Sequence, residues 1–257
     1  MKTFDHHSGD YLAVGSARIY YEVTGNPEGP VLLFLHGGLC TMDTYDTVVP
    51  RFFDHYKIIG IDTRGHGKST LGSDTLTYEQ IEQDVEAVLE HLGIQTLSII
   101  GFSDGGIVAY RLAGSRKRTI EHVITIGSDW STEHAQEAFP LLQKVTADFW
   151  KEKRPEDIES YDQFNPEPDF ERLVKAVVAL WCDASSTGYP NEIVDSITCP
   201  VLAIRGAGDY LVAPSGIHEL AQRLKTAMAL EIPDAAHEVH REQPEAFLKA
   251  CEAFLGK

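Results

Sequence analysis

Residues Thr96–Ala113, TLSIIGFSDGGIVAYRLA, decide the fold of this chain. They begin with the short apolar run Leu97–Phe102, which is typical of a buried parallel strand, and end with a helix-length apolar segment. Between the two lies Gly-Phe-Ser-Asp-Gly, residues 101–105. A strand that becomes a helix so quickly crowds the backbone around Ser103, and the flanking glycines remove Cβ atoms that would collide. We therefore expect a tight, strained turn that projects the Ser103 hydroxyl at the start of a helix.

This turn indicates acyl-transfer chemistry. The first amides of a helix have no intrahelical partner, and they can stabilise the negative charge that develops on an attacked carbonyl oxygen. A serine hydroxyl also needs a base, and histidine has its usual pKa near neutral pH. His237 follows the last predicted strand, so we expect it at the same sheet edge as Ser103. His240 is the nearest rival, but we expect it to enter the approach to the next helix.

The base needs an acid that orients the imidazole and balances its charge. Asp209 ends the sequence Arg-Gly-Ala-Gly-Asp directly after a buried predicted strand, and its glycines allow the chain to turn back across the sheet edge. Asp129, at the end of the preceding strand, is the alternative. Ser103, Asp209 and His237 then follow the chain order Ser, Asp, His that such a layout requires.

Strand and helix patterns alternate from residue 31 to 126 and again after residue 200, which predicts βαβ units and a mainly parallel sheet. The predicted strands are 11–14, 17–23, 31–35, 56–61, 97–102, 122–126, 201–205 and 228–232. The predicted helices are 44–53, one that Thr77 begins, 170–181, 215–224 and 244–255. We expect one core made of residues 1–129 and 198–257, with a helical cap inserted at 130–197.

Composition narrows the function. The 257 residues suffice for one large domain with an insertion, and no apolar run approaches the ~20 residues that span a bilayer. A net charge of −17 argues against nucleic acid and anionic membranes as partners. Four scattered cysteines and the lack of an apolar leader favour a cytoplasmic protein. Metal and nucleotide motifs are missing, so we expect a small-molecule substrate and no metal or cofactor; the sequence does not indicate the oligomeric state.

The predicted cap is acidic and aromatic. Residues 131–196 contain 14 Asp and Glu against 6 Lys and Arg, a net charge of −8. A carboxylate at Asp104 is favoured by the helix dipole, yet beside an oxyanion it is unfavourable unless it is paired. A cationic substrate group could supply that pairing, which predicts a preference for α-amino esters. The candidate substrate-binding residues are Asp104, Trp130, Phe139, Trp150 and Trp181.

Five motifs together resemble the α/β-hydrolase fold superfamily over essentially the whole chain. They are His36-Gly-Gly38, Asp62–Ser69 (DTRGHGKS), Gly101–Gly106, Gly206–Asp209, and Ala236-His237 before Glu242-Gln-Pro-Glu-Ala-Phe. The resemblance implies an eight-stranded sheet with one antiparallel strand, an inserted helical cap and a triad of Ser103, His237 and Asp209. It also implies an oxyanion hole formed by the backbone N–H groups of Gly38 and Asp104, and a structural role for the Arg64 motif. The Ser-Asp-Gly-Gly turn is similar to that of valacyclovir-hydrolase-like esterases.

The expected activity is that of a metal-free serine hydrolase that cleaves a small carboxylic ester, lactone or thioester. Serine at the nucleophile position disfavours the superfamily's haloalkane dehalogenases and epoxide hydrolases, in which aspartate stands there. Amide cleavage, acyl transfer and hydrolysis of carbon–carbon bonds use similar groups and remain open. A ligand receptor on the same fold, with a vestigial triad, is the alternative from another class.

Overall fold

The computed structural model describes residues 3–256 and contains an eight-stranded sheet with the order β1-β2-β4-β3-β5-β6-β7-β8. Strand β2 is antiparallel to both of its neighbours, and β3 to β8 pair in parallel. The strands are β1 (Asp10–Val14), β2 (Ala17–Gly25), β3 (Val31–Leu35), β4 (Lys57–Asp62), β5 (Thr96–Phe102), β6 (Thr119–Ile126), β7 (Val201–Gly206) and β8 (Ala227–Ile232). The predicted fold class is confirmed. Residues 1, 2 and 257 of the predicted core lie outside the described residues.

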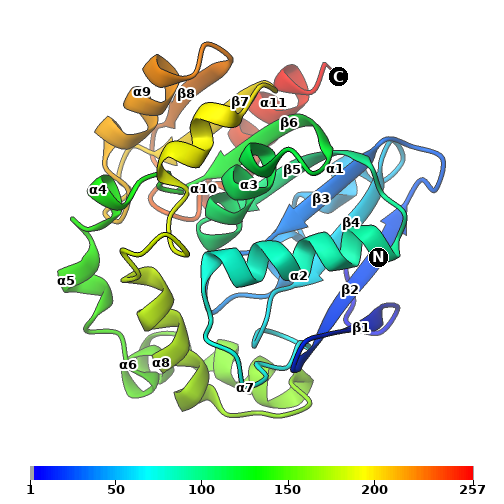
Figure 1. Cartoon of the computed structure of the whole chain (residues 1–257), viewed down its shortest axis with the longest axis vertical. Helices are drawn as coiled ribbons and strands as arrows, with labels where there is room; N and C mark the ends of the chain where they lie inside the picture. The colour runs from blue at the N-terminus through cyan, green and yellow to red at the C-terminus, as the bar shows by residue number, and fades with distance from the viewer. Residues whose placement is uncertain (1–2, 257) are drawn as a thin grey trace.

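Helices cover both faces of the sheet (Figure 1). Leu33 and Leu35 of β3 belong to one apolar cluster, whereas Leu32 and Phe34 belong to another, because successive side chains of a strand point to opposite faces. The first cluster is shared with α2 (Tyr78–His91), α3 (Asp104–Ser115) and α9 (Pro214–Arg223). The second is shared with α1 (Val49–Phe52), α10 (Val239–Glu242) and α11 (Pro244–Phe254).

Helix α2 begins and ends as its sequence predicts. The Thr77 side chain accepts a hydrogen bond of 3.0 Å from the Gln80 amide, and Gly93 follows the helix with φ of 68°. Capping at Thr77 fixes Tyr78 as the first helical residue, which is fully buried. Tyr78 is the residue by which this helix contributes to the site described below.

The helix predicted over residues 44–53 is two separate elements, η1 (Met42–Tyr45) and α1. Pro50 lies in the first turn of α1. Proline has no amide hydrogen and its ring clashes with the preceding turn, so a helix that started at residue 44 would be interrupted there. The single-helix prediction was therefore wrong.

The segment between β6 and β7 is helical, and Figure 1 shows α5 to α8 gathered at the lower left, away from α11. Its elements are α4 (Thr132–Ala135), α5 (Phe139–Leu142), α6 (Ala147–Lys153), α7 (Pro155–Phe164), α8 (Phe170–Trp181) and η2 (Asn191–Ser196). Helix α8 has the predicted bounds and buries Leu173, Val174 and Val177 in the first cluster. By contrast, α5 and α6 contain no fully buried residue.

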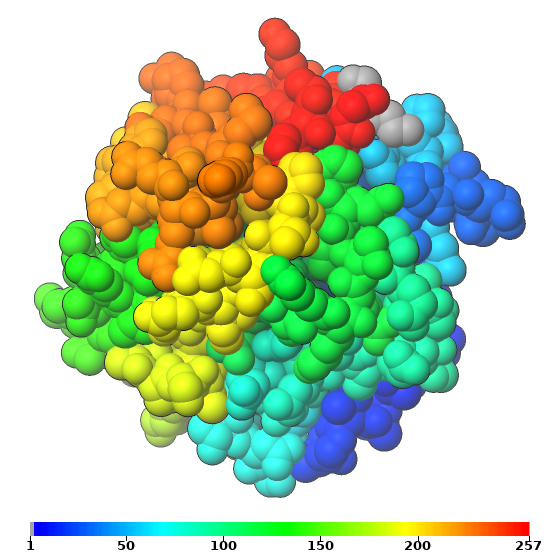
Figure 2. All heavy atoms as spheres, turned by 45° about the horizontal axis from the view of Figure 1, so that its top comes forward, coloured from blue at the N-terminus to red at the C-terminus, as the bar shows by residue number. Residues whose placement is uncertain are grey.

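The return from this segment to the sheet packs on α3. In the space-filling view of Figure 2 the yellow residues around η2 lie beside the green residues of α3 and the orange residues of α9. Arg116, just after α3, donates a hydrogen bond of 2.7 Å to the carbonyl oxygen of Ser196. Within residues 3–256, no helix has both the length and the apolar character needed to cross a bilayer.

Candidate active site

The turn between β5 and α3 has the strained geometry that its sequence predicts. Ser103 has φ of 50° and ψ of −116°, an unfavourable conformation for a residue with a side chain. A Cβ atom on Gly105 would overlap the carbonyl oxygen of Leu35, and one on Gly101 would overlap that of Gly105. Both glycines are thus required by close backbone contacts. The turn leaves the Ser103 side chain half-buried and facing a cavity.

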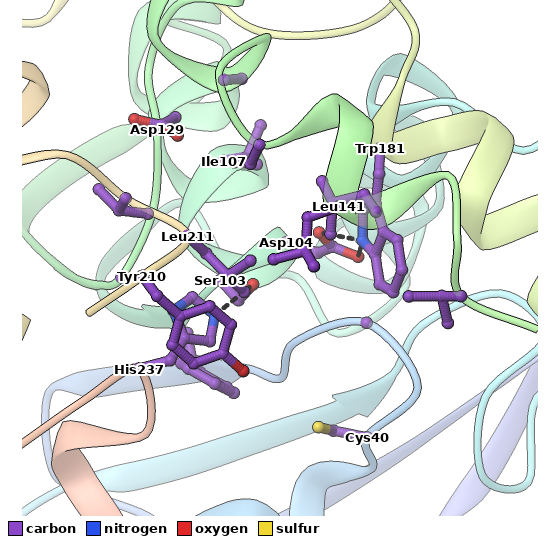
Figure 3. A pocket seen from close by; sticks show the side chains of 18 of the residues that line it. Cys40, Ser103, Asp104, Ile107, Asp129, Leu141, Trp181, Tyr210, Leu211 and His237 are labelled. Atoms are coloured by element: carbon purple, nitrogen blue, oxygen red, sulfur yellow. Dashed lines mark hydrogen bonds between the residues drawn. The ribbon is translucent and has the colours of Figure 1, made fainter. Parts of the chain in front are cut away.

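Three loops at the same sheet edge bring Ser103, His237 and Asp209 together (Figure 3). His237 Nε2 lies 3.1 Å from Ser103 Oγ, and His237 Nδ1 lies 3.0 Å from Asp209 Oδ2. Asp209 Oδ1 accepts a hydrogen bond of 2.9 Å from the amide of Leu211. Burial opposes the charge on Asp209, but the hydrogen bond and charge of His237 hold the pKa of its carboxyl below the usual value.

His240 and Asp129, the alternatives to His237 as the base and to Asp209 as the acid, have other surroundings. His240 is fully buried in α10, and its Nε2 lies 2.9 Å from Thr44 Oγ1. Burial, with the charges of Arg241 and His237, lowers the pKa of His240 to about 3. Asp129 lines the cavity, but its buried Oδ1 has no hydrogen-bond partner among residues 3–256. Neither residue therefore takes part in the chain of hydrogen bonds that ends at Ser103.

The loop that follows β3 lies against the start of α3. A Cβ atom on Gly37 would lie 3.1 Å from Ser103 Cβ, and one on Gly38 would lie 2.5 Å from Asp104 Oδ2. This close approach puts Gly38 against the side chain of Asp104, the first residue of α3. Amides at a helix N-terminus have no intrahelical acceptor. The backbone N–H of Asp104 therefore follows Ser103 directly and has no acceptor within its own helix.

Side chains of the motif at residues 62–69 support the loop that follows β3. The amide of Leu39 donates a hydrogen bond of 3.0 Å to His66 Nε2. Burial lowers the pKa of His66 to about 3, so the ring is neutral and can accept that bond. Arg64 is fully buried and donates two hydrogen bonds, of 2.7 and 2.6 Å, to the carboxylate of Asp84. These contacts give the motif a structural role.

Asp104 is paired within the protein. Its Oδ1 accepts hydrogen bonds from the Tyr78 hydroxyl (2.8 Å) and from Trp181 Nε1 (3.0 Å), and its Oδ2 lies 3.0 Å from the same indole nitrogen. Burial raises the pKa of Asp104 to about 6, although both hydrogen bonds act in the opposite direction. Donors on α2 and α8 thus stabilise a carboxylate beside the proposed oxyanion position, a role that the sequence alone left to a cationic substrate.

The site opens into a cavity of about 560 Å³. Its floor is made by the strand-end loops, and its roof is made by residues of α5 and α6. Two of the candidate substrate-binding aromatic residues, Trp150 and Trp181, line it together with Asp104. The volume is within the range of pockets that hold small organic ligands.

Trp130 and Phe139, the other two candidates, are absent from the cavity lining within the described chain. The indole of Trp130 donates a hydrogen bond of 2.8 Å to the carbonyl oxygen of Gly216, and the Arg223 guanidinium lies over its ring. Phe139 packs beside Tyr189, with 6.5 Å between the ring centroids. Both side chains join α4 or α5 to the core, so the structure does not support a substrate-binding role for either.

Sequence reasoning missed most of the aliphatic lining. The side chains of Leu141, Leu142 and Val145 reach the cavity from α5 and the turn after it, and Tyr210 and Leu211 reach it from the loop after β7. The loop residues could have been predicted from the sequence, because Tyr210 and Leu211 directly follow the candidate acid Asp209. The sequence carries no such signal for the roof, because a helix as short as α5 is too short for a hydrophobic period to reveal its inner face.

Comparison with known proteins identifies the family of this chain. A family model described as alpha/beta hydrolase fold matches residues 30–180. The 3-oxoadipate enol-lactonase 2 of Acinetobacter baylyi is 26% identical over 265 residues, which cover 97% of this chain and 97% of that protein.

Two solved structures share the fold. The enol-lactonase of Burkholderia xenovorans LB400 has a TM-score of 0.75 at 24% identity, over 96% of this chain and 100% of that one. A thermophilic esterase from Thermogutta terrifontis has a TM-score of 0.73 at 20% identity, over 96% and 98%. Strand order, strand-end site and family match lead to one conclusion: the chain belongs to the alpha/beta hydrolase fold family.

Proposed function

We propose that this protein is a serine hydrolase that cleaves a small carboxylic ester, lactone or thioester through an acyl-enzyme. The observation that carries the proposal is the unbroken chain of hydrogen bonds from Asp209 through His237 to Ser103, at the floor of a mainly apolar cavity. A base within 3.1 Å of the hydroxyl, itself oriented by a buried carboxylate, is the arrangement that activates a serine nucleophile.

In the proposed reaction, Ser103 Oγ attacks the substrate carbonyl carbon while its proton passes to His237 Nε2. Asp209 keeps the other ring nitrogen protonated and stabilises the imidazolium that forms. His237 then returns the proton to the departing alcohol or thiol, which leaves an ester on Ser103. Water, deprotonated by the same histidine, attacks this ester and releases the acid, so that each proton taken up is given back.

The oxyanion of both tetrahedral intermediates is assigned to the backbone N–H groups of Gly38 and Asp104. Support comes from the close approach of the Gly37-Gly38 loop to Ser103 and from the position of Asp104 as the first residue of α3. Preorganised donors of this kind are each worth about 10²- to 10³-fold in kcat. The Asp104 side chain lies nearby, and Tyr78 and Trp181 bind its charge.

The substrate class follows from the cavity and the relatives. Apolar side chains such as Leu141 and Phe149 dominate the roof and suit an aliphatic or aromatic acyl or alcohol group. The Acinetobacter baylyi relative is a lactonase by name, and lactones and open-chain esters are attacked at the same type of carbonyl carbon. We therefore place both in the proposed substrate class.

A turnover panel tests the proposal. Purified protein is given p-nitrophenyl esters of increasing acyl length, a γ-lactone, an acyl thioester and a 1,3-diketone, and each is scored by kcat/KM. We expect steady, multiple turnover of at least one ester, lactone or thioester. A single slow turnover with a large rise in Tm would instead indicate a receptor, and selective turnover of the diketone would indicate a carbon–carbon hydrolase.

A further inference from the structure

The roof of the cavity has few polar attachments to the floor. Helices α5 and α6 contain no fully buried residue, and α6 packs on α7 and α8 of the same inserted segment (Figure 1). Within residues 3–256, one hydrogen-bonded ion pair joins residues 139–163 to the core, since Arg154 Nη1 donates a hydrogen bond of 2.9 Å to Glu238 Oε1. Glu238 directly follows His237. The pair therefore connects the roof with the loop of the proposed base.

Arg154 lies at the corner between α6 and α7. Its amide donates a hydrogen bond of 2.7 Å to the carbonyl oxygen of Trp150, and its backbone, with φ of −140° and ψ of 61°, leaves the helical conformation there. The residue is thus fixed to the last turn of α6. Phe149 and Trp150 of that helix line the cavity. The position of Arg154 therefore sets the position of these two side chains in the roof.

Glu238, the partner of Arg154, belongs to a firmly held loop. The carboxylate of Glu242 in α10 accepts hydrogen bonds of 2.7 and 2.9 Å from the amides of Ala236 and Glu238, which lie on either side of His237. Backbone contacts of this kind fix the loop independently of the roof. The Glu238 carboxylate is therefore a fixed point on the floor to which the roof is attached.

Arg154 also separates two acids that would otherwise repel each other. Its Nε lies 3.4 Å from Asp157 Oδ2 on the roof, while its Nη1 binds Glu238 on the floor. Burial raises the pKa of Asp157 above its usual value, the charge of Arg154 opposes this rise, and the charge of Glu238 adds to it. Without the guanidinium, a roof carboxylate would face a floor carboxylate. The loss of Arg154 thus replaces an attraction between roof and floor by a repulsion.

Neighbouring cations cannot replace Arg154. Lys144 and Lys153 also line the cavity, but both are exposed and neither forms an ion pair within the described chain. Arg241 donates a hydrogen bond of 3.0 Å to Glu238 Oε2, but it belongs to α10 and is absent from the cavity lining that the structure describes. It therefore binds the same carboxylate without holding the roof.

We propose that Arg154 is a positioning residue that ties the roof to the loop of the base through Glu238 and thereby sets the acyl-chain preference of this enzyme. The inference rests on the proposed function, since the preference is one of ester cleavage at Ser103. Arg154 acts through the roof and does not contact the reacting atoms, so it affects KM and not kcat. The two paired side chains are 30% and 27% exposed, and salt therefore weakens the tie.

The kinetic test compares p-nitrophenyl octanoate with p-nitrophenyl acetate. Arg154→Met should raise KM for the octanoyl ester about three- to fivefold, as expected of a partly exposed ion pair, and should leave kcat and the acetyl KM nearly unchanged. Sodium chloride at 1 M should move the octanoyl-to-acetyl KM ratio of the wild type toward that of the variant at the same salt. Arg241→Met is the matched control and should change neither ester. An equal effect of Arg241→Met, or a fall in kcat for both esters, overturns the proposal.

Amide hydrogen exchange, read by mass spectrometry, tests the tie without turnover. Peptides from α6 should exchange about three- to fivefold faster in Arg154→Met and in Glu238→Gln, and the double variant should be no faster than either, because both changes remove one contact. Peptides from α8, which is buried in the first apolar cluster, should be unchanged. Unaltered exchange of α6 contradicts the proposal even if esters are cleaved. Faster exchange in a protein that cleaves no ester confirms the tie and contradicts only the proposed function.

Discussion

The floor and the roof of the cavity are built differently. On the floor, Ser103, His237 and Asp209 are fixed by hydrogen bonds and by backbone contacts that only glycine permits. On the roof, Leu141 is 46% and Phe149 is 44% exposed, and their short helices have no fully buried residue. Bond-breaking chemistry needs atoms held to fractions of an ångström, whereas an apolar surface tolerates change. We therefore expect floor variants to affect kcat and roof variants to affect substrate preference.

The largest effect is expected at the nucleophile. Ser103→Ala removes the attacking oxygen but no structural hydrogen bond, so the protein should fold and kcat should fall by about 10⁵- to 10⁶-fold. The fall in kcat is measured with p-nitrophenyl butyrate as the substrate, and the Tm of the variant is the control for folding. Activity of the variant within tenfold of the wild type would show that the floor is not the reacting surface.

The next largest effect is expected at the acid. Asp209→Asn should reduce kcat by about 10⁴-fold, because an amide favours the wrong tautomer of His237. On the same neutral ester, Asp129→Asn should cost at least 100-fold less than Asp209→Asn, since Asp129 does not contact the ring. The reverse ranking would move the acid from the end of β7 to the end of β6.

A smaller effect is expected on the roof. Phe149→Ala removes apolar lining and should lower kcat/KM for octanoyl esters about five- to tenfold, with little change for acetyl esters, since a buried methylene contributes ~0.8 kcal/mol. Tyr11→Ala is the matched control, because Tyr11 is a similarly exposed aromatic residue (43%) of β1 that does not line the cavity. An equal loss of kcat/KM for acetyl and octanoyl esters would indicate that Phe149 affects the chemical step and not the binding of the acyl chain.

The last effect concerns folding stability beneath the floor and not turnover. The folded-state pKa of His240 is about 3, below its unfolded value, so the stabilisation by neutral His240 is complete above pH 6.5 and is lost as pH falls toward 3. Urea unfolding should show the wild type losing up to ~1.4 kcal/mol per pH unit more than His240→Gln in this window. Parallel pH profiles for the two proteins would mean that His240 is not held neutral.

The floor could be predicted from sequence because its signals are local. The glycines around Ser103, the apolar strand before Asp209 and the loop before α10 each place one side chain at a strand end, and parallel strands share that edge. The partners of Asp104 could not be predicted, since Trp181 lies 77 residues away and meets it only through the packing of α8.

The roof escaped prediction for a different physical reason. Trp130 and Trp181 are both buried aromatic residues of the same segment, and only the packing of their helices decides which of them faces the cavity. Helices as short as α5 carry too few residues for a hydrophobic period to reveal the inner face. Composition alone therefore identified an apolar cavity but not its lining.

Covalent labelling tests the central claim, that Ser103 is the nucleophile, most directly. The protein is treated with a fluorophosphonate probe, digested and sequenced by mass spectrometry, with Ser103→Ala and Asp209→Asn treated in parallel. We predict one adduct, on Ser103, slower labelling of Asp209→Asn and none of Ser103→Ala. An adduct on another residue, or a wild-type protein that remains unmodified, would contradict the account.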